Sequence, residues 1–152
     1  MQTHSLSLHA VPALTALAVF LATMGAVSPT VAQEAADGRL TIELNAMSTD
    51  EAACTFVFLL QNEGAAEIES VVYEAVLFDA AGGVNRLTLF DFGTLPAARP
   101  RVRQFVIPEL SCDDLGSVLI NGAQTCTIGG APSEFCEDSL GLRSRVDVKL
   151  IG

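Results

Sequence analysis

The stretch "LQNEGAAEIESVVYEAVLFDAAGGV", Leu60–Val84, places a β-forming run between two polar turns. Asn62 opens the first turn and Asp79 opens the second. Short Asn and Asp side chains accept hydrogen bonds from backbone N–H groups two residues later, and the Gly residues that follow tolerate positive φ. The stretch therefore predicts a strand-turn-strand unit, and it favours structural rather than catalytic roles for Asn62 and Asp79.

The same pattern recurs along the chain, where short runs of Val, Ile, Leu and Phe are interrupted by Gly, Pro, Asn and Asp. About seven strands are expected, at residues 39–46, 54–62, 70–79, 86–93, 101–107, 116–122 and 143–151. A long excursion, residues 123–142, precedes the last strand, in which Val146, Val148 and Leu150 alternate with polar residues. This order predicts an all-β fold: an immunoglobulin-like antiparallel β-sandwich of about seven strands, after an N-terminal signal helix.

The first 32 residues resemble a secretory leader in composition. They contain no Lys, Arg, Asp or Glu, and the segment Ala10–Ala26 is apolar. Small residues at Thr30 and Ala32 follow it, which predicts a signal peptide (1–32) cleaved after about Ala32, a short linker (33–38) and a single domain (39–152). The alternative is an uncleaved membrane anchor, although the apolar segment is at the lower limit of length for spanning a bilayer.

Charge and residue inventory exclude several function classes. The chain has 18 acidic and 8 basic residues, for a net charge of −10, which opposes general binding to nucleic acid. Both His residues, His4 and His9, lie in the predicted leader, so the exported part lacks the usual general base and the commonest transition-metal ligand. We therefore expect no enzyme activity and no cofactor.

Four cysteines, Cys54, Cys112, Cys126 and Cys136, lie in the predicted domain, without a C-x-x-C pair. An even number in an exported domain favours two disulfides. In the expected sandwich Cys54 and Cys112 lie at one end and the other two lie at the opposite end, which favours pairing Cys54 with Cys112 and Cys126 with Cys136. These pairs close loops of about 59 and 11 residues, worth about 4 and 3 kcal/mol by chain entropy. The other candidate pairs Cys54 with Cys126 across the core.

Two further resemblances rest on longer segments. "LLQNEG" and "VVYEAVLFDAAGGV", followed by "FGTLPAARPRVRQFVIP", resemble exported immunoglobulin-like bacterial domains that share an F-x-L-Y-D-type signature, here at Leu77, Phe78 and Asp79. Residues 37–152 also resemble a set of alphaproteobacterial exported proteins that are often labelled by a twin-arginine signal, through "DGRLTIELNA", "EAVLFDAAGGVNRLTLFDFGTLPAARPRVRQF" and "VLINGA". The resemblance implies the fold and export. The chain has no Arg-Arg before its apolar segment, so the general secretory route is equally compatible with it.

Three arginines, Arg99, Arg101 and Arg103, have strand spacing, so they are expected to share one face of a strand. In the simpler interpretation this face is exposed to solvent, and the guanidinium groups form ion pairs with neighbours such as Glu74 or Asp91. In the functional interpretation the three form a basic stripe that docks an acidic partner or an anionic surface. The sequence thus offers these three arginines as its candidate site for docking a partner.

The parity of this strand raises a conflict, because Phe105 and Ile107 share the parity of the arginines and are expected to be buried. A bulge near Gln104, or a strand that leaves the sheet edge, would resolve it.

Acidic residues form two smaller groups. Asp113 and Asp114 are adjacent in a segment that predicts a capped turn, and Glu134, Glu137 and Asp138 lie in the excursion. A solvated surface is the simpler interpretation of the second group, and a calcium site is the alternative.

Together these features favour an exported periplasmic protein without catalysis, a protein-interaction or accessory module of the cell envelope. Its expected partner is an envelope protein, with no nucleic acid and no membrane span after cleavage. The alternative is a periplasmic protein that binds a small ligand or calcium through residues 123–142.

Overall fold

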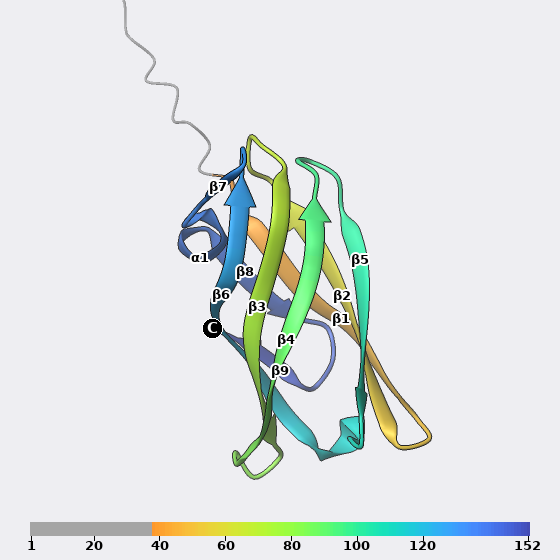
Figure 1. The fold of residues 1–152 in the computed structure, drawn as a ribbon. Helices are drawn as coiled ribbons and strands as arrows, with labels where there is room; N and C mark the ends of the chain where they lie inside the picture. Colours follow the sequence, from red (N-terminus) through yellow and green to blue (C-terminus); the bar gives the residue numbers. More distant parts are fainter. Residues whose placement is uncertain (1–37) are drawn as a thin grey trace, which may run out of the picture. The chain divides into compact units, whose positions relative to one another are not determined.

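The computed structural model describes residues 38–152, and this part of the chain consists mainly of β-strands (Figure 1). The predicted signal peptide, residues 1–32, and the predicted linker up to residue 37 lie outside the described residues. No helix within residues 38–152 has the length and hydropathy needed to cross a bilayer.

Two sheets pack face to face. The four-stranded sheet has the order β5-β2-β1-β8, formed by β1 (Leu40–Asp50), β2 (Ala53–Asn62), β5 (Arg101–Pro108) and β8 (Leu140–Ser144). The five-stranded sheet has the order β4-β3-β6-β7, formed by β3 (Ile68–Asp79), β4 (Val84–Leu95), β6 (Leu115–Ile128) and β7 (Ala131–Pro132), with β9 (Lys149–Ile151) beside β6. The predicted all-β sandwich is confirmed, and β2 and β6 lie in different sheets, as an immunoglobulin-like arrangement requires.

Strand pairing is antiparallel except at two places, where β8 runs parallel to β1 and β9 runs parallel to β6. The expected last strand, residues 143–151, is therefore wrong as one strand, because its two halves belong to different sheets. The Ser144 hydroxyl holds the bend between them: it accepts from the Val146 N–H (3.3 Å) and donates to the Val148 carbonyl (2.6 Å). Val148 and Leu150 are nevertheless buried, so the alternation predicted burial correctly.

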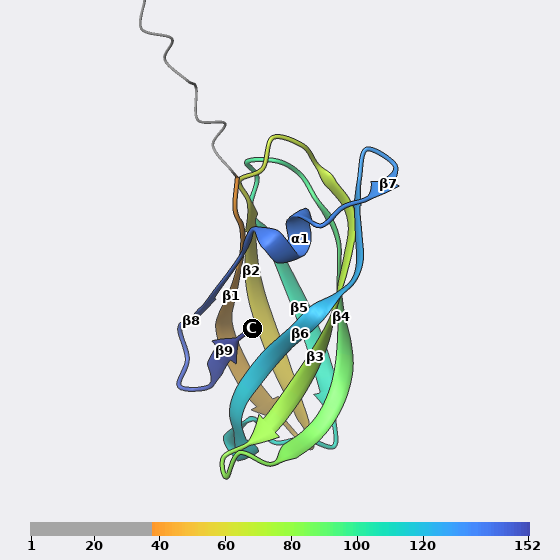
Figure 2. The same ribbon diagram turned by 90° about the vertical axis from the view of Figure 1, so that its left-hand side faces the viewer.

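The expected excursion, residues 123–142, is mostly regular structure, because β6 continues to Ile128. Gly129 and Gly130, with φ of +61° and +74°, form a two-residue hairpin turn to β7. The short helix α1 (Phe135–Asp138) follows, and Figure 2 shows it between β6 and β8 near the upper end of the sandwich.

The core is rich in aromatic rings because β2 and β4 turn alternate side chains inward. Phe58 lies at its centre, with ring centroids 5.1 Å from Phe90, 5.4 Å from Phe92 and 6.0 Å from Phe105. Such pairs contribute about 0.5–1.5 kcal/mol each beyond the burial of their area. Phe105 comes from β5 and the other two from β4, so these rings join the two edge strands of opposite sheets.

The turn residue Asp79 has the predicted role. Its Oδ1 accepts from the backbone N–H of Ala81 (2.9 Å) and of Gly83 (2.8 Å), and Gly82 between them has a φ of +86°.

Candidate functional site

Two disulfides fasten the ends of the sandwich. Cys54 pairs with Cys112 (Cα–Cα 5.0 Å) and Cys126 pairs with Cys136 (Cα–Cα 6.0 Å), which confirms the pairing that the strand layout favoured. The second disulfide attaches α1 to β6. The two bonds indicate an oxidising, extracellular-type environment.

Tyr73 supports the same end from inside the core. Its hydroxyl donates to the Cys136 carbonyl, and its side chain is fully buried. Burial raises the pKa of the Tyr73 phenol far above its ordinary value, and the negative charge of Glu137 adds to the rise. The phenol is thus a neutral, fixed hydrogen-bond donor.

The acidic side chains of the excursion do not form a metal site. Glu137 accepts from the Ala123 N–H (2.8 Å), and no cluster of three His, Cys, Asp or Glu side chains suited to a metal ion occurs within residues 38–152. Glu134 and Asp138 are therefore not brought together with Glu137 as ligands.

Local turns explain two other segments that the sequence singled out. Ser111 caps the 3-10 turn Cys112–Asp114, because its hydroxyl accepts from the Asp113 N–H (3.4 Å), and Asp114 lies in the same turn. Ser133 accepts in the same way from the Phe135 N–H (3.2 Å) at the start of α1.

The strand β5, which carries two of the three candidate arginines, forms an edge of the four-stranded sheet. Its pairing with β2 is continuous from Ala53↔Pro108 to Leu60↔Arg101. Neither the expected bulge near Gln104 nor a departure from the sheet edge occurs, so that prediction is wrong.

Side chains alternate regularly along β5. Arg101 and Arg103 are half-buried on the inner side with Phe105, whereas Val102 and Val106 face outward and are 57% and 61% exposed. The expectation that these arginines lie on a solvent-exposed face of the sheet is therefore also wrong. The arrangement is possible because β5 is an edge strand, where a long inward-facing side chain reaches the open side of the sandwich.

Arg103 spans this open side. Its Nε donates to the Phe92 carbonyl (2.9 Å) and its Nη2 donates to the Thr94 carbonyl (3.2 Å), both on β4. Arg86 of β4 reaches back in the opposite direction, and its Nη1 donates to the Pro108 carbonyl (3.0 Å). Two guanidinium groups thus connect the edges of the two sheets. The sequence carried no signal for the role of Arg86.

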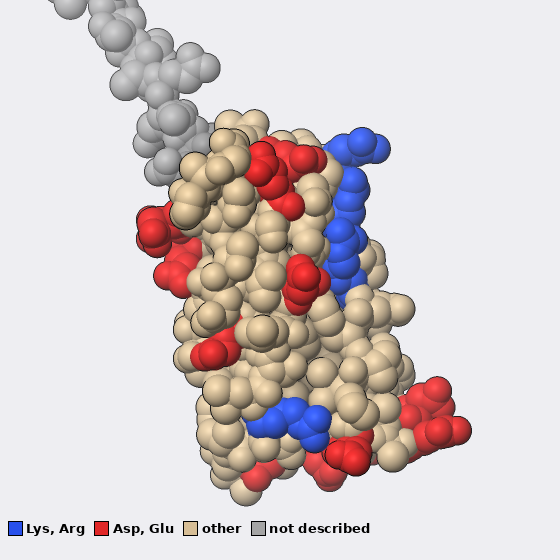
Figure 3. Space-filling view, in the orientation of Figure 1, with Lys and Arg blue, Asp and Glu red and all other residues tan. Residues whose placement is uncertain are grey.

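Arg99 and Arg101 differ from Arg103 because neither donates to β4: Arg101 donates only to the adjacent Pro100 carbonyl (3.1 Å), and neither of the two reaches a carboxylate of the described chain. The expected partners are engaged elsewhere: Glu74 accepts from the Asn121 side chain, and Asp91 accepts from the Gly93 N–H (2.9 Å). Within residues 38–152 the one ion pair joins Arg145 to Glu43 (2.6 Å). Figure 3 shows basic side chains along the upper part of the β5 side, on a surface whose other charges are mainly acidic.

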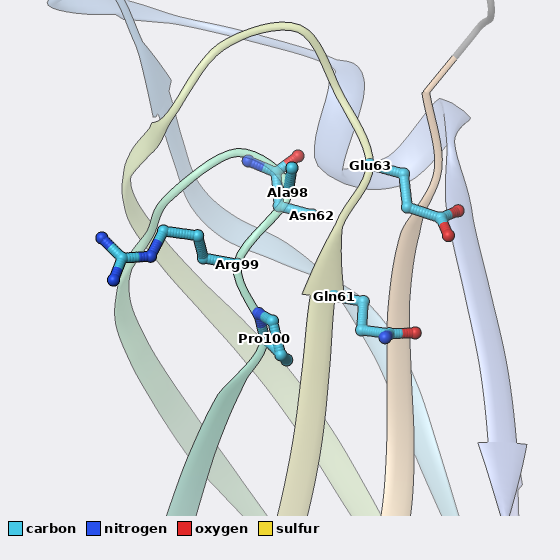
Figure 4. A pocket seen from close by; sticks show the side chains of 6 residues that line it. All are labelled: Gln61, Asn62, Glu63, Ala98, Arg99 and Pro100. Carbon is cyan, nitrogen blue, oxygen red and sulfur yellow. The ribbon is translucent and has the colours of Figure 1, made fainter.

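A pocket of about 320 Å³ lies where the end of β2 meets the connection from β4 to β5 (Figure 4). Its lining residues are Gln61, Asn62, Glu63, Ala98, Arg99 and Pro100. The Arg99 side chain extends away from Gln61 and Glu63 (Figure 4).

Asn62 organises this region from a buried position, with 1% exposure. Its Oδ1 accepts from the Gly64 N–H (2.9 Å), as the sequence predicted. Its Nδ2 donates to the carbonyls of Ala66 (2.8 Å) and Leu95 (2.9 Å), and its backbone carbonyl accepts from the Ala98 N–H (2.8 Å). Asn62 therefore ties the turn after β2 to the loop that presents Arg99, a connection that the sequence did not reveal.

The fold and its cross-links define a β-sandwich pinned by two disulfides, and at one edge of its described part Arg99 and Arg101 bond neither to a carboxylate nor to the opposite sheet. No family model and no curated protein sequence matches the chain. Among solved structures the chain is similar to IrmA from Escherichia coli, with a TM-score of 0.57 and 12% identity over 69% of this chain and 91% of that chain. At this identity the similarity shows the fold alone.

Proposed function

We propose that this protein is an exported, non-catalytic interaction module of the bacterial periplasm, and that it binds an acidic envelope protein through Arg99 and Arg101. The observation that carries the proposal is the grouping of these two guanidinium groups at one sheet edge of a strongly acidic protein, where they bond neither to a carboxylate of the described residues nor to β4. Arg groups form bidentate, charge-assisted hydrogen bonds with carboxylates, so they suit recognition of an acidic surface.

The neighbouring surface supports the same conclusion. On β5, Val102 lies between Arg101 and Arg103, and Val106 lies further along the strand. Both valines are more than half exposed. Arg together with exposed apolar side chains is typical of the central part of a protein interface. The positive charge at the beginning of β5 also raises the rate at which an acidic partner associates.

Two observations support the location and the lack of catalysis. The leader-like segment of residues 1–32 and the two disulfides favour an exported protein. The chain has no His after residue 9, which removes the usual general base of hydrolytic sites.

The test is crosslinking of the tagged full chain in its native cells, followed by identification of the captured proteins. We expect the wild type to capture an acidic envelope protein, and Arg99→Gln/Arg101→Gln to capture it about tenfold less. Arg143→Gln/Lys149→Gln is the matched control, because it removes the same charge from exposed positions on β8 and β9. Equal capture by all three chains, or no capture by the wild type, would refute the proposal.

A further inference from the structure

The edge of β5 carries opposite charges at its two ends. Arg99 and Arg101 lie at its beginning. Its end leads into the exposed Glu109 and lies beside the tip of the β1–β2 hairpin, because Ala53 pairs with Pro108. Asp50, the last residue of β1, and Glu51 lie at this tip. Figure 3 shows basic side chains on the upper part of this side of the molecule and acidic side chains at its lower corner.

This polarity is self-complementary in one orientation. If two β5 strands lie side by side and antiparallel, a two-fold axis places the basic end of each strand beside the acidic end of the other. The contact is isologous, so the same favourable charge pairing occurs twice and the assembly closes as a dimer. A parallel arrangement would bring like charges together.

The spacing of residues along β5 agrees with this orientation. When the two-fold axis passes through Gln104, Arg99 of one copy lies opposite Glu109 of the other. The same register places Val102 opposite Val106, and these two valines are among the most exposed large apolar side chains of the described chain, at 57% and 61%. One register thus pairs the charges at both ends and covers the apolar side chains between them.

From this pattern we infer that the edge of β5 binds a second copy of this chain, antiparallel, with the two-fold axis at Gln104. The inference rests on the proposed function, since it names the partner that Arg99 and Arg101 recognise. Arg103 retains its bonds to the Phe92 and Thr94 carbonyls of β4 in this dimer and releases the one to the Val102 carbonyl (3.1 Å). Because β5 has only eight residues, the dimer is reversible and salt-sensitive.

The first test is sedimentation velocity of the oxidised protein from about 1 to about 200 µM, a range that covers affinities typical of small interfaces. We expect a monomer–dimer equilibrium that shifts toward monomer in high salt. Arg99→Glu and Glu109→Arg should each weaken the dimer about tenfold or more, and the double variant Arg99→Glu/Glu109→Arg should restore it. Arg143→Glu, on β8, is the control and should leave the dimer unchanged.

The second test addresses the register and does not depend on charge. Residues opposite each other in an antiparallel pair have Cα atoms about 4.5–5.5 Å apart, within the range of a disulfide. Gln104→Cys should therefore form a disulfide-linked dimer on mild oxidation, whereas Gln61→Cys, at an exposed position of β2, should not.

The outcomes separate this inference from the proposed function. A monomer at all concentrations, no restoration by the double reversal, or equal crosslinking of both cysteine variants overturns the dimer. If the wild type is monomeric yet captures another acidic protein in a manner that depends on Arg99 and Arg101, the proposed function stands and the dimer falls. If neither association occurs, both fall.

Discussion

Replacement of Asn62 by Ala tests whether one buried amide holds the two loops of the candidate site together. The variant loses three hydrogen bonds, of 2.8, 2.9 and 2.9 Å, and leaves the Gly64 N–H and the Leu95 carbonyl without their partner. Since a typical hydrogen bond contributes about 1 kcal/mol net, the free energy of unfolding should fall by about 3 kcal/mol. A domain of ordinary stability, about 5–15 kcal/mol, remains folded after this loss.

The assay is urea unfolding followed by far-ultraviolet circular dichroism with both disulfides intact, because the sequence has no Trp and only one Tyr. The urea dependence, m, should stay unchanged, so that the loss reports stability alone. Gln61→Ala is the control: Gln61 precedes Asn62 but is exposed, and it should change stability by less than about 0.5 kcal/mol. A loss below about 1 kcal/mol for Asn62→Ala would refute the view that this amide connects the loops.

Three further predictions address the rest of the described chain. Cys126→Ser/Cys136→Ser should lower the free energy of unfolding by about 3 kcal/mol, measured by urea unfolding, since the bond closes a short loop; a loss below about 1 kcal/mol would contradict the chain-entropy argument. The pKa of the Glu43 carboxyl lies below its ordinary value of 4.5, owing first to a hydrogen bond from a neighbouring side-chain amide. The charged carboxylate therefore stabilises the fold at pH values above 4.5. This stabilisation is lost as the pH falls through the lower pKa of the folded state. Glu43→Gln should therefore flatten the acid side of the stability–pH profile, and an unchanged profile would show that Glu43 is not responsible. Arg103→Gln should cost about 1–2 kcal/mol of unfolding free energy through its lost bonds to β4, whereas Arg99→Gln should cost less than about 0.5 kcal/mol, and equal losses would show that Arg103 does not connect the sheets.

The features that could be predicted from the sequence depend on local chemistry. Alternation with a period of two located the centres of the first six strands, because each of them has an inward face against the core. The Asx turns at Asn62 and Asp79 also follow from short-range hydrogen bonding. The disulfide pairing followed from the expected ends of the strands, which the sandwich topology largely determines.

Features that depend on contacts distant in sequence were not predicted. The end of the chain alternates regularly through Val146, Val148 and Leu150, although its backbone bends and passes from one sheet to the other. Alternation reports which side chains face the core, and it does not report which sheet supplies the neighbouring strand. The parallel pairing of β8 with β1 and of β9 with β6 therefore had no local signal.

The arginines of β5 show why the parity argument failed and what this means for the candidate site. The predicted bulge rests on the assumption that an inward-facing residue is surrounded by the core, so that Arg101 and Phe105 could not share a side. At an edge strand the inner side opens toward the neighbouring sheet, and a long side chain such as Arg103 finds carbonyl partners there. Arg103 consequently connects the two sheets, whereas Arg99 and Arg101, which make no bond to β4, are the residues through which we propose that a partner binds. A triple Gln variant would mix a loss of stability with any loss of binding, so only the pair Arg99→Gln/Arg101→Gln isolates the proposed binding role of this edge.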